Sequence, residues 1–282
     1  MRKLFVILFL ITTAVLNSYS QNYEPLDLAK KIFGKDSMPD IGNYVIGEYK
    51  GRPNGLGLRK GSTTKFLLLD QTDKKAVVAM TVLDSTGKGH DAYLHFTKNS
   101  SWKMNAFRIF ALTGIIEQAK NELEKLTPQQ VDDIIKSSKK NKKGNEYSLF
   151  TSKEDYEFEL GNARLTLDLD DKIMEHFLKN ETEFERIRNS ILNELHGQQI
   201  DKAIDMNVGD VLKPDYRKLF ISSVTTGGYE FGNCINFLIG GMEDNSVGYL
   251  YTKDKNDLPE INPNRIIMLR EIGSGWYIYK TT

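Results

Sequence analysis

The sequence has a single cysteine and only seven prolines among its 282 residues. Because a disulfide needs two cysteines, no bond of this kind can form within the chain. Packing must therefore stabilise the fold, and a chain of this length can bury enough apolar surface to do so. Cys234 lies in an apolar stretch, residues 233–241, and we interpret it as a small buried hydrophobic residue rather than a nucleophile.

The sequence also lacks an excess of charge of either sign. Its 38 basic and 38 acidic residues give a net charge of zero, which excludes a global attraction to nucleic acid or to an anionic membrane. The one basic cluster, residues 136–143 (KSSKKNKK), contains no aromatic residue on which a base could stack. We interpret residues 137–150 as a solvated basic linker and expect no nucleic-acid partner.

Long hydrophobic runs are missing after the first 20 residues. Two basic residues, Arg2 and Lys3, follow Met1, then come the apolar residues 4–15 and the small residues Ser18 and Ser20. This order is typical of a secretory signal, whereas a membrane anchor would need about 20 consecutive apolar residues. We expect residues 1–20 to be removed between Ser20 and Gln21, leaving a periplasmic or secreted chain with no transmembrane segment.

The first part of the sequence has the pattern of a sheet. Short apolar and β-branched segments are separated by turn-forming groups of polar residues, and such short connections favour antiparallel hairpins. A short helix at residues 26–33 precedes them. We expect strands at residues 43–50, 64–70, 76–84, 92–97 and 102–107.

The hydrophobic period changes after this sheet. Apolar residues recur at steps of three and four over residues 109–126, which predicts an amphipathic helix. Thr127, Pro128 and Gln130 then supply an N-cap, a first-turn proline and a capping-box partner for a second helix. These two helices end the first predicted domain, residues 21–136.

The second predicted domain, residues 151–282, follows a similar plan. It begins with a hairpin at residues 156–169 and continues with helical spacing over residues 173–195, where Thr182 offers a capping box at a break. Strands follow at residues 216–224, 233–240, 246–252, 265–272 and 276–281. The sequence thus predicts an α+β protein with two tandem domains.

The last strand of each predicted domain follows a polar turn and begins with a tryptophan, in NSSWKMNAF at Trp102 and in GSGWYIYKT at Trp276. This arrangement resembles the cystatin-like and NTF2-like superfold, and residues 246–282 are similar to a segment of many uncharacterised exported bacterial proteins. The resemblance implies a helix and a curved antiparallel sheet in each domain, and it carries no catalytic signature. Cystatin inhibitors use a Gln-x-Val-x-Gly hairpin, whereas residues 71–75 are QTDKK, which counts against protease inhibition.

The candidate metal and cofactor residues do not have the spacing that known binding motifs require. His90 and His95 are five residues apart in a predicted strand, so they lie on opposite faces and cannot share a metal. Residues 168–171 and 254–257 begin like calcium loops, but neither continues with the required turn glycine, and we interpret both as solvated turns or helix starts. The glycine-rich residues 55–62 match no phosphate-binding motif. We therefore predict no metal, no cofactor and no catalytic residue.

Aromatic residues form the remaining pattern. Tyr249 and Tyr251 share one face of their predicted strand, as do Tyr277 and Tyr279. A tyrosine-rich open sheet face would suit a ligand, a partner domain or a second subunit, although we favour the alternative that these tyrosines pack against the other domain. The candidate binding residues are Tyr93, His95, Tyr249, Tyr251, Tyr277 and Tyr279.

These observations favour a non-catalytic binding or protein-interaction module. Its partner would be a protein, a small molecule or a second copy in a homodimer. The alternative is an NTF2-like isomerase or hydrolase with a pocket between helix and sheet, for which the polar candidates are Tyr93, His95, Glu48 and Asp84. A third alternative is an inhibitor or immunity protein, for which the sequence supplies no dedicated feature.

Overall fold

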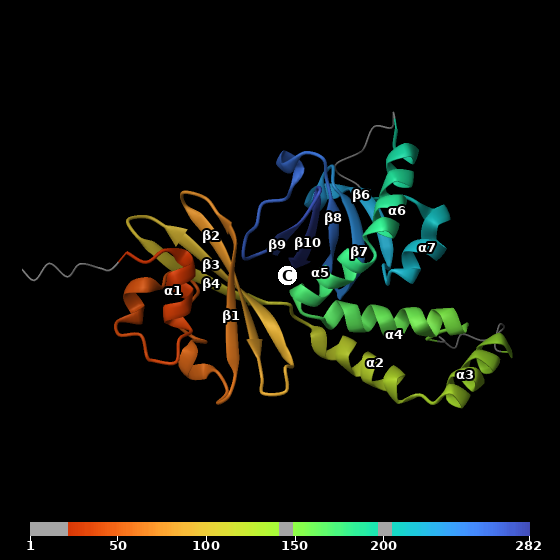
Figure 1. Ribbon diagram of the computed structural model, residues 1–282, viewed down its shortest axis with the longest axis horizontal. Coiled ribbons are helices and arrows are strands. Elements are labelled where there is room, and N and C mark those ends of the chain that lie inside the picture. The colour runs from red at the N-terminus through yellow and green to blue at the C-terminus, as the bar shows by residue number, and fades with distance from the viewer. Residues whose placement is uncertain (1–21, 141–148, 197–204) are drawn as a thin grey trace, which may run out of the picture.

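The computed structural model describes residues 22–140, 149–196 and 205–282. It contains two antiparallel β-sheets, one of four strands and one of six, with helices beside both (Figure 1). The chain is therefore an α+β protein, as its two hydrophobic periods predict. Within these three ranges no helix is both long and apolar enough to cross a membrane.

The first sheet is a simple meander that follows one short helix. Its strands are hydrogen-bonded in the order β1-β2-β3-β4, and each pair is antiparallel. Because side chains alternate, Val78 and Met80 of β2 face α1, whereas Val77 and Ala79 face the second half of the chain. The elements are α1 (Pro25–Ile32), β1 (Thr63–Gln71), β2 (Lys75–Leu83), β3 (Gly89–Lys98) and β4 (Trp102–Ile109).

Three helices follow the first sheet and precede the two that cover the second sheet. They are α2 (Thr113–Lys125), α3 (Pro128–Lys140) and α4 (Lys153–Leu167). The predicted capping box of α3 forms, since the Thr127 N–H donates to Gln130 Oε1 at 2.8 Å and the Gln130 N–H donates to Thr127 Oγ1 at 3.3 Å. Leu123, Val131 and Phe150 form a small core of these helices, which lies below the second sheet in Figure 1.

The second sheet has a different topology from the first. Its order is β5-β6-β7-β8-β10-β9, so the last strand inserts between the two that precede it. Helices α5 and α6 pack over one face of this sheet, where Phe177 and Phe184 contact Trp276. The elements are α5 (Asp170–Lys179), α6 (Glu181–Glu194), β5 (Asp205–Asn207), α7 (Lys213–Lys218), β6 (Ser223–Gly227), α8 (Gly228–Phe231), β7 (Ile235–Met242), β8 (Asn245–Tyr251), β9 (Ile266–Gly273) and β10 (Trp276–Thr281).

Two predicted β segments are wrong because α4 and a loop occupy their places. Residues 156–169, predicted as a hairpin, lie almost wholly in α4, whose N-terminus is capped by Ser152 accepting from the Asp155 N–H. Residues 43–50, predicted as a strand, contain the end of a 3₁₀ turn (Ile41–Tyr44) and one isolated bridge between Val45 and Met104. The Ile46 and Tyr49 N–H groups of that loop donate to the Met104 and Asn105 carbonyls, so the loop lies along the free edge of β4 without forming a strand.

A third prediction is correct only at its end. Residues 216–224 were expected to form one strand, but α7 takes the first three of them and β6 begins only at Ser223. Pro214 stands in the first turn of α7, where a proline costs no hydrogen bond and its fixed φ favours the helix. The proline therefore explains why a helix replaces the start of this strand.

Some predictions fall on residues outside the described ranges. The predicted secretory signal, residues 1–20, and its cleavage position are among them, as are residues 141–148 of the predicted basic linker. Residues 137–140 of that linker belong to the last turn of α3. The domain limits and the signal therefore stay predictions.

One hydrophobic core joins the two sheets. Val77, Ala79 and Tyr93 of the first sheet belong to the same buried cluster as Ile173 of α5 and Ile267 of β9. The C-terminus of the chain lies between the sheets in Figure 1. Any polar side chain in this contact is therefore surrounded largely by apolar residues, and several such side chains cluster there.

Candidate functional site

The contact between the two sheets contains a buried polar cluster, here called the junction and made of Thr81, Asp91, Tyr93, His95, Asp170 and Lys280. Asp91, Tyr93 and His95 alternate along β3, so they share the face directed at the second half. Asp170 begins α5 and Lys280 lies near the end of β10. Apart from Thr81, each of these residues is 7% exposed or less.

Asp91 caps a helix from the other half of the chain. The residue before α5 is Leu169, which has no side-chain acceptor for the first N–H groups. Asp91 Oδ2 instead accepts from the Asp170 N–H at 2.7 Å, and its Oδ1 accepts from the Thr81 hydroxyl. A carboxylate at this position also interacts favourably with the positive end of the helix dipole. The first sheet thus supplies a cap that the local sequence of α5 lacks.

Asp170 is the centre of the junction. Its carboxylate accepts from the Tyr93 hydroxyl at 2.9 and 3.0 Å and lies 2.8 Å from Lys280 Nζ. Two buried carboxylates therefore face one buried ammonium group. Burial, followed by the nearby Asp170 charge, raises the pKa of Asp91. The same two causes raise the pKa of Tyr93 well above its ordinary value, which keeps its hydroxyl protonated as a donor.

His95 lies further along the same face and is 4% exposed. Burial, followed by the nearby positive charge of Arg108, lowers the pKa of His95 to about 4, against a weaker opposite effect of the Ile267 backbone. Arg108 donates to the Pro263 carbonyl and pairs with Glu48. The His95 Nε2 atom has no hydrogen-bond partner within the described part of the chain. A neutral, buried histidine therefore sits where the two sheets meet.

The four predicted C-terminal tyrosines do not form an open face. The pairing of β8 with β10 places Tyr249 beside Ile278 and Tyr251 beside Trp276, under the helices, whereas Tyr277 and Tyr279 point to the opposite side. All four are 5% exposed or less. Tyr249 donates to the Ile173 carbonyl at 2.8 Å and Tyr279 donates to Asn236 Oδ1 at 2.9 Å. Both faces of this sheet are thus packed, largely by elements of the same half.

The other residues singled out from the sequence lie apart. His90 is exposed and opposite to His95 on β3, and Asp84 lies in the exposed turn between β2 and β3. Residues 168–171 are a helix start, but Asp170 is buried rather than solvated as expected. Burial raises the pKa of Cys234 to about 12, which makes it a poor nucleophile. In the ranges that the structure describes, no cluster of three or more His, Cys, Asp or Glu side chains could hold a metal ion.

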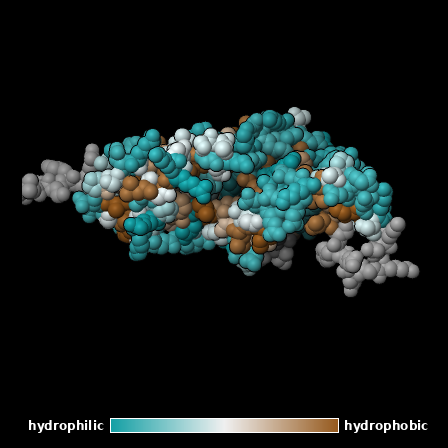
Figure 2. All heavy atoms as spheres, turned by 90° about the horizontal axis from the view of Figure 1, so that it is seen from below, coloured by the Kyte–Doolittle hydropathy of each residue, from teal (hydrophilic) through white to brown (hydrophobic). Residues whose placement is uncertain are grey.

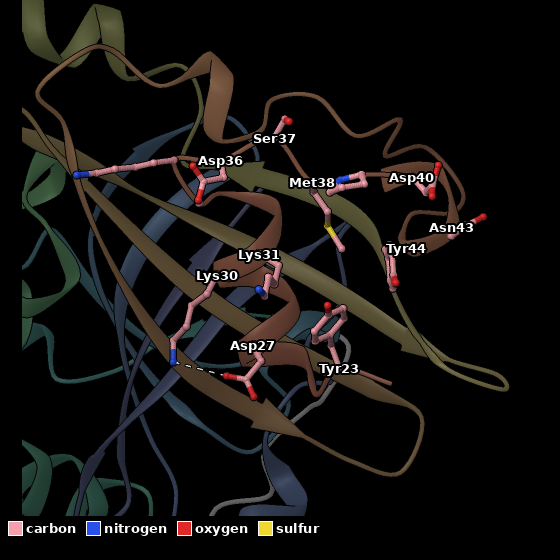
Figure 3. A pocket seen from close by; sticks show the side chains of 13 residues that line it. Tyr23, Asp27, Lys30, Lys31, Asp36, Ser37, Met38, Asp40, Asn43 and Tyr44 are labelled. Atoms are coloured by element: carbon pink, nitrogen blue, oxygen red, sulfur yellow. Dashed lines mark ion pairs between the residues drawn. The ribbon is translucent and has the colours of Figure 1, made fainter. Parts of the chain in front are cut away.

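The second region is a hollow of about 800 Å³ beside α1, here called the α1 pocket. It lies between α1 and the loop that follows it (Figure 3), so one continuous segment builds it. Its volume is in the range of small-molecule sites. The lining residues are Tyr23, Asp27, Lys30, Lys31, Gly34, Lys35, Asp36, Ser37, Met38, Pro39, Asp40, Asn43 and Tyr44.

The α1 pocket combines aromatic and charged side chains. The rings of Tyr23 and Tyr44 are 5.6 Å apart and tilted by 55°, and Met38 points from the loop toward Lys31 (Figure 3). The amphipathic pattern of α1 explains the arrangement, because Leu28 and Ile32 face the sheet and direct the charged residues outward. The pocket residues were not predicted from the sequence, since they match no motif and only the fold of the loop brings them together.

Beyond the α1 pocket, the described surface includes a smaller and more open hollow. The face shown in Figure 2 is mostly hydrophilic, with hydrophobic residues in separate patches. A second hollow, between α2 and α3, is lined by only five residues and is wide open to solvent. Comparison of the chain with family models, with curated proteins and with solved structures finds no match. The site must therefore be interpreted from its own geometry.

Proposed function

We propose that the chain is an exported, non-catalytic binding protein that holds a small molecule in the α1 pocket. The observation that carries this proposal is the contrast in access between the two polar regions. The acidic, basic and aromatic side chains of the junction are closed off between the sheets. Similar residue types line the α1 pocket in an open hollow large enough for a small ligand.

Three finer statements belong to the same proposal. The first is the arrangement as two tandem domains, each a helix and a curved sheet of the cystatin-like or NTF2-like type. The second is export through a cleaved signal at residues 1–20, and the third is a periplasmic or extracellular location. The simple meander beside α1 supports the first statement for the N-terminal half. The inserted β10 of the second sheet departs from the simple meander.

Met38 provides a direct test of binding in the α1 pocket. Its methyl group points into the hollow (Figure 3), so a bound molecule will change its environment. We suggest labelling the methionine methyl groups with ¹³C and recording NMR spectra of residues 21–282 against a fragment library. Met80 and Met104, which are 1% and 0% exposed in the core beneath α1, serve as internal controls.

The expected result is a set of fragments that shift the Met38 resonance and leave Met80 and Met104 unchanged. If no fragment in the library moves the Met38 signal selectively, the α1 pocket is not a small-molecule site and the proposal fails. If a fragment that binds there is chemically converted during the measurement, the protein is an enzyme and the non-catalytic part of the proposal is wrong.

A further inference from the structure

We infer that the ligand of the α1 pocket carries a flat aromatic ring next to a single carboxylate or other singly charged anionic group. This inference rests on the proposed function, because it names the chemical class of ligand for the same site. Three features of the pocket carry it. They are a pair of aromatic rings, a lysine with no acidic partner, and an acidic rim.

The aromatic rings define where the flat part of the ligand would lie. Tyr23 and Tyr44 are half-buried, and their ring centroids are 5.6 Å apart at an angle of 55°. The two rings therefore form a corner rather than a parallel stack, and a third ring can contact one face-on and the other edge-on. The Met38 side chain reaches toward this corner from the loop (Figure 3), and thioethers pack well against aromatic rings.

Lys31 supplies the positive charge beside this corner. Its Nζ lies 6.0 Å from the centre of the Tyr23 ring, at the outer limit of a cation–π interaction. Its neighbour Lys30 pairs with Asp27 at 3.8 Å. By contrast, no carboxylate in the described ranges lies within 4 Å of the Lys31 ammonium group. An anionic group attached to a ring in the corner would be the natural partner for this charge.

The rim limits how much negative charge the ligand can carry. Asp27, Asp36 and Asp40 line the same hollow as Lys30, Lys31 and Lys35, so the lining has no net charge. A polyanion such as a nucleotide or an inositol phosphate would meet these three carboxylates as well as the lysines. A ligand with one anionic group can contact Lys31 and stay clear of the acidic rim. The lining therefore favours a monoanion over both neutral compounds and polyanions.

Four small probes separate the two parts of this inference. Phenylacetate has the ring and the anion, 2-phenylethanol has the ring alone, acetate has the anion alone, and phenethylammonium has the ring with the opposite charge. Their affinities are measured by titration against the Met38 methyl signal. We expect phenylacetate to bind most tightly, by about fivefold over 2-phenylethanol, which corresponds to about 1 kcal/mol for one partly exposed charge interaction.

Matched variants test whether the affinity for these probes comes from residues of the α1 pocket. Lys31→Gln should reduce phenylacetate affinity about fivefold and leave that of 2-phenylethanol unchanged, whereas Lys31→Arg should retain both. Tyr44→Leu, which keeps the apolar packing of this residue, should weaken both ring-containing probes. The controls are Lys253→Gln and Tyr229→Ala, since both residues are exposed and belong to the second half of the chain. Neither control should change any affinity.

Two outcomes would overturn the inference and differ from failure of the proposed function. If 2-phenylethanol or phenethylammonium binds as tightly as phenylacetate, the anionic group is not recognised. If Lys31→Gln and Lys253→Gln have equal effects, the affinity comes from overall charge rather than from the pocket. In either case, library fragments that shift Met38 would still support a binding site there. If no compound of any class shifts Met38, the proposed function itself fails.

Discussion

The junction and the α1 pocket contain the same kinds of residue, but these residues are buried in the junction and largely open to solvent in the pocket. Asp170, Lys280 and Tyr93 meet between the two sheets, where each is 3% exposed or less. Asp27, Lys31 and Tyr23 meet beside α1, where the aspartate and lysine are exposed and the tyrosine is half-buried. In the junction, Asp91, Tyr93, Asp170 and Lys280 are enclosed and are joined by hydrogen bonds and an ion pair, whereas in the pocket the polar groups leave space for another molecule.

Solvent access, rather than residue type, therefore separates a structural cluster from a candidate site. Coulombic interactions are strong in the poorly polarisable junction, so each charge there depends on its partner. In the pocket, water screens the same charges, and little stability depends on them. Substitutions in the junction should therefore affect folding, and substitutions in the pocket should affect binding alone.

The largest expected effect comes from removing the buried ammonium group. Lys280→Met keeps the length of the side chain but leaves the carboxylates of Asp91 and Asp170 without their positive partner. Breaking a buried ion pair in this way typically costs about 3–5 kcal/mol, and we expect the free energy of unfolding in urea to fall by this amount. The double variant Lys280→Met with Asp170→Asn should recover more than about 1 kcal/mol, because it also removes one unpaired charge.

If Lys280→Met were instead as stable as the unmodified chain to within about 1 kcal/mol, the charges of the junction would have to be hydrated in solution. The contrast with the α1 pocket would then disappear. A second sign of this result would be equal stability of the single and double variants, since no unpaired charge would remain to be removed.

Lowering the pH should reduce the free energy of unfolding, because buried His95 resists protonation in the folded chain. Its pKa is lowered to about 4 in the folded chain, compared with about 6.5 when unfolded. The unfolded chain therefore binds the proton first, so the stability that neutral His95 contributes is complete above pH 6.5 and is lost as the pH falls toward 4. Between pH 7.5 and 4.5 this loss is about 2–3 kcal/mol.

The variant His95→Gln isolates this effect, because glutamine does not titrate. The difference in unfolding free energy between the unmodified chain and the variant should change by about 2–3 kcal/mol between pH 7.5 and 4.5. Asp91 acts in the opposite direction, since its pKa is raised and its folded state takes up a proton more readily, but this residue is the same in both proteins. A pH-independent difference would show that His95 is solvated or has an acidic partner.

Two buried tyrosine hydroxyls test whether a hydrogen bond to a charged group in the junction stabilises the fold more than a hydrogen bond to a neutral group. Tyr93 donates to the Asp170 carboxylate and Tyr249 donates to the Ile173 carbonyl, and both rings are 0% exposed. Hydrogen bonds to charged groups contribute about 1.5–3 kcal/mol, compared with about 0.5–1.5 kcal/mol for neutral pairs. Tyr93→Phe should therefore lower the unfolding free energy more than Tyr249→Phe does. Equal losses of unfolding free energy in the two variants would mean that the charge of Asp170 does not strengthen its hydrogen bond with Tyr93.

The sequence was sufficient for most strands and for the capping box of α3. The capping box predicted at Thr182 is wrong, because α6 already begins at Glu181 and its N-cap residue, Asn180, makes no side-chain cap hydrogen bond. β2 and β3 are short, largely apolar segments bounded by turn residues, and Thr127 with Gln130 forms a capping box whose partners are three residues apart. These signals come from residues that are close in the sequence, so they can be recognised without knowledge of the tertiary contacts. Helix α4 was missed because apolar residues alternate over residues 163–169, and a helix that packs on β7 and α2 can bury both sides of that pattern.

The candidate site was less accessible from the sequence, for a physical reason. Asp91 and Asp170 are 79 positions apart in the chain, so no spacing rule connects the cap of α5 with a strand of the first sheet. That His90 and His95 lie on opposite faces of β3 follows from alternation, and the structure agrees. The α1 pocket depends on how residues 36–44 fold back over the helix, and loops without a motif carry little information about their own path.

A substitution in the α1 pocket should have the smallest effect on stability. Lys31 is exposed and has no ion pair within the described ranges, so Lys31→Gln removes only a favourable charge near the end of α1. We expect the melting temperature to change by no more than about 2 °C, which differential scanning calorimetry measures directly. A shift as large as that of Lys280→Met would contradict the distinction between the regions, because Lys31 would then be part of the folded core rather than of an open site.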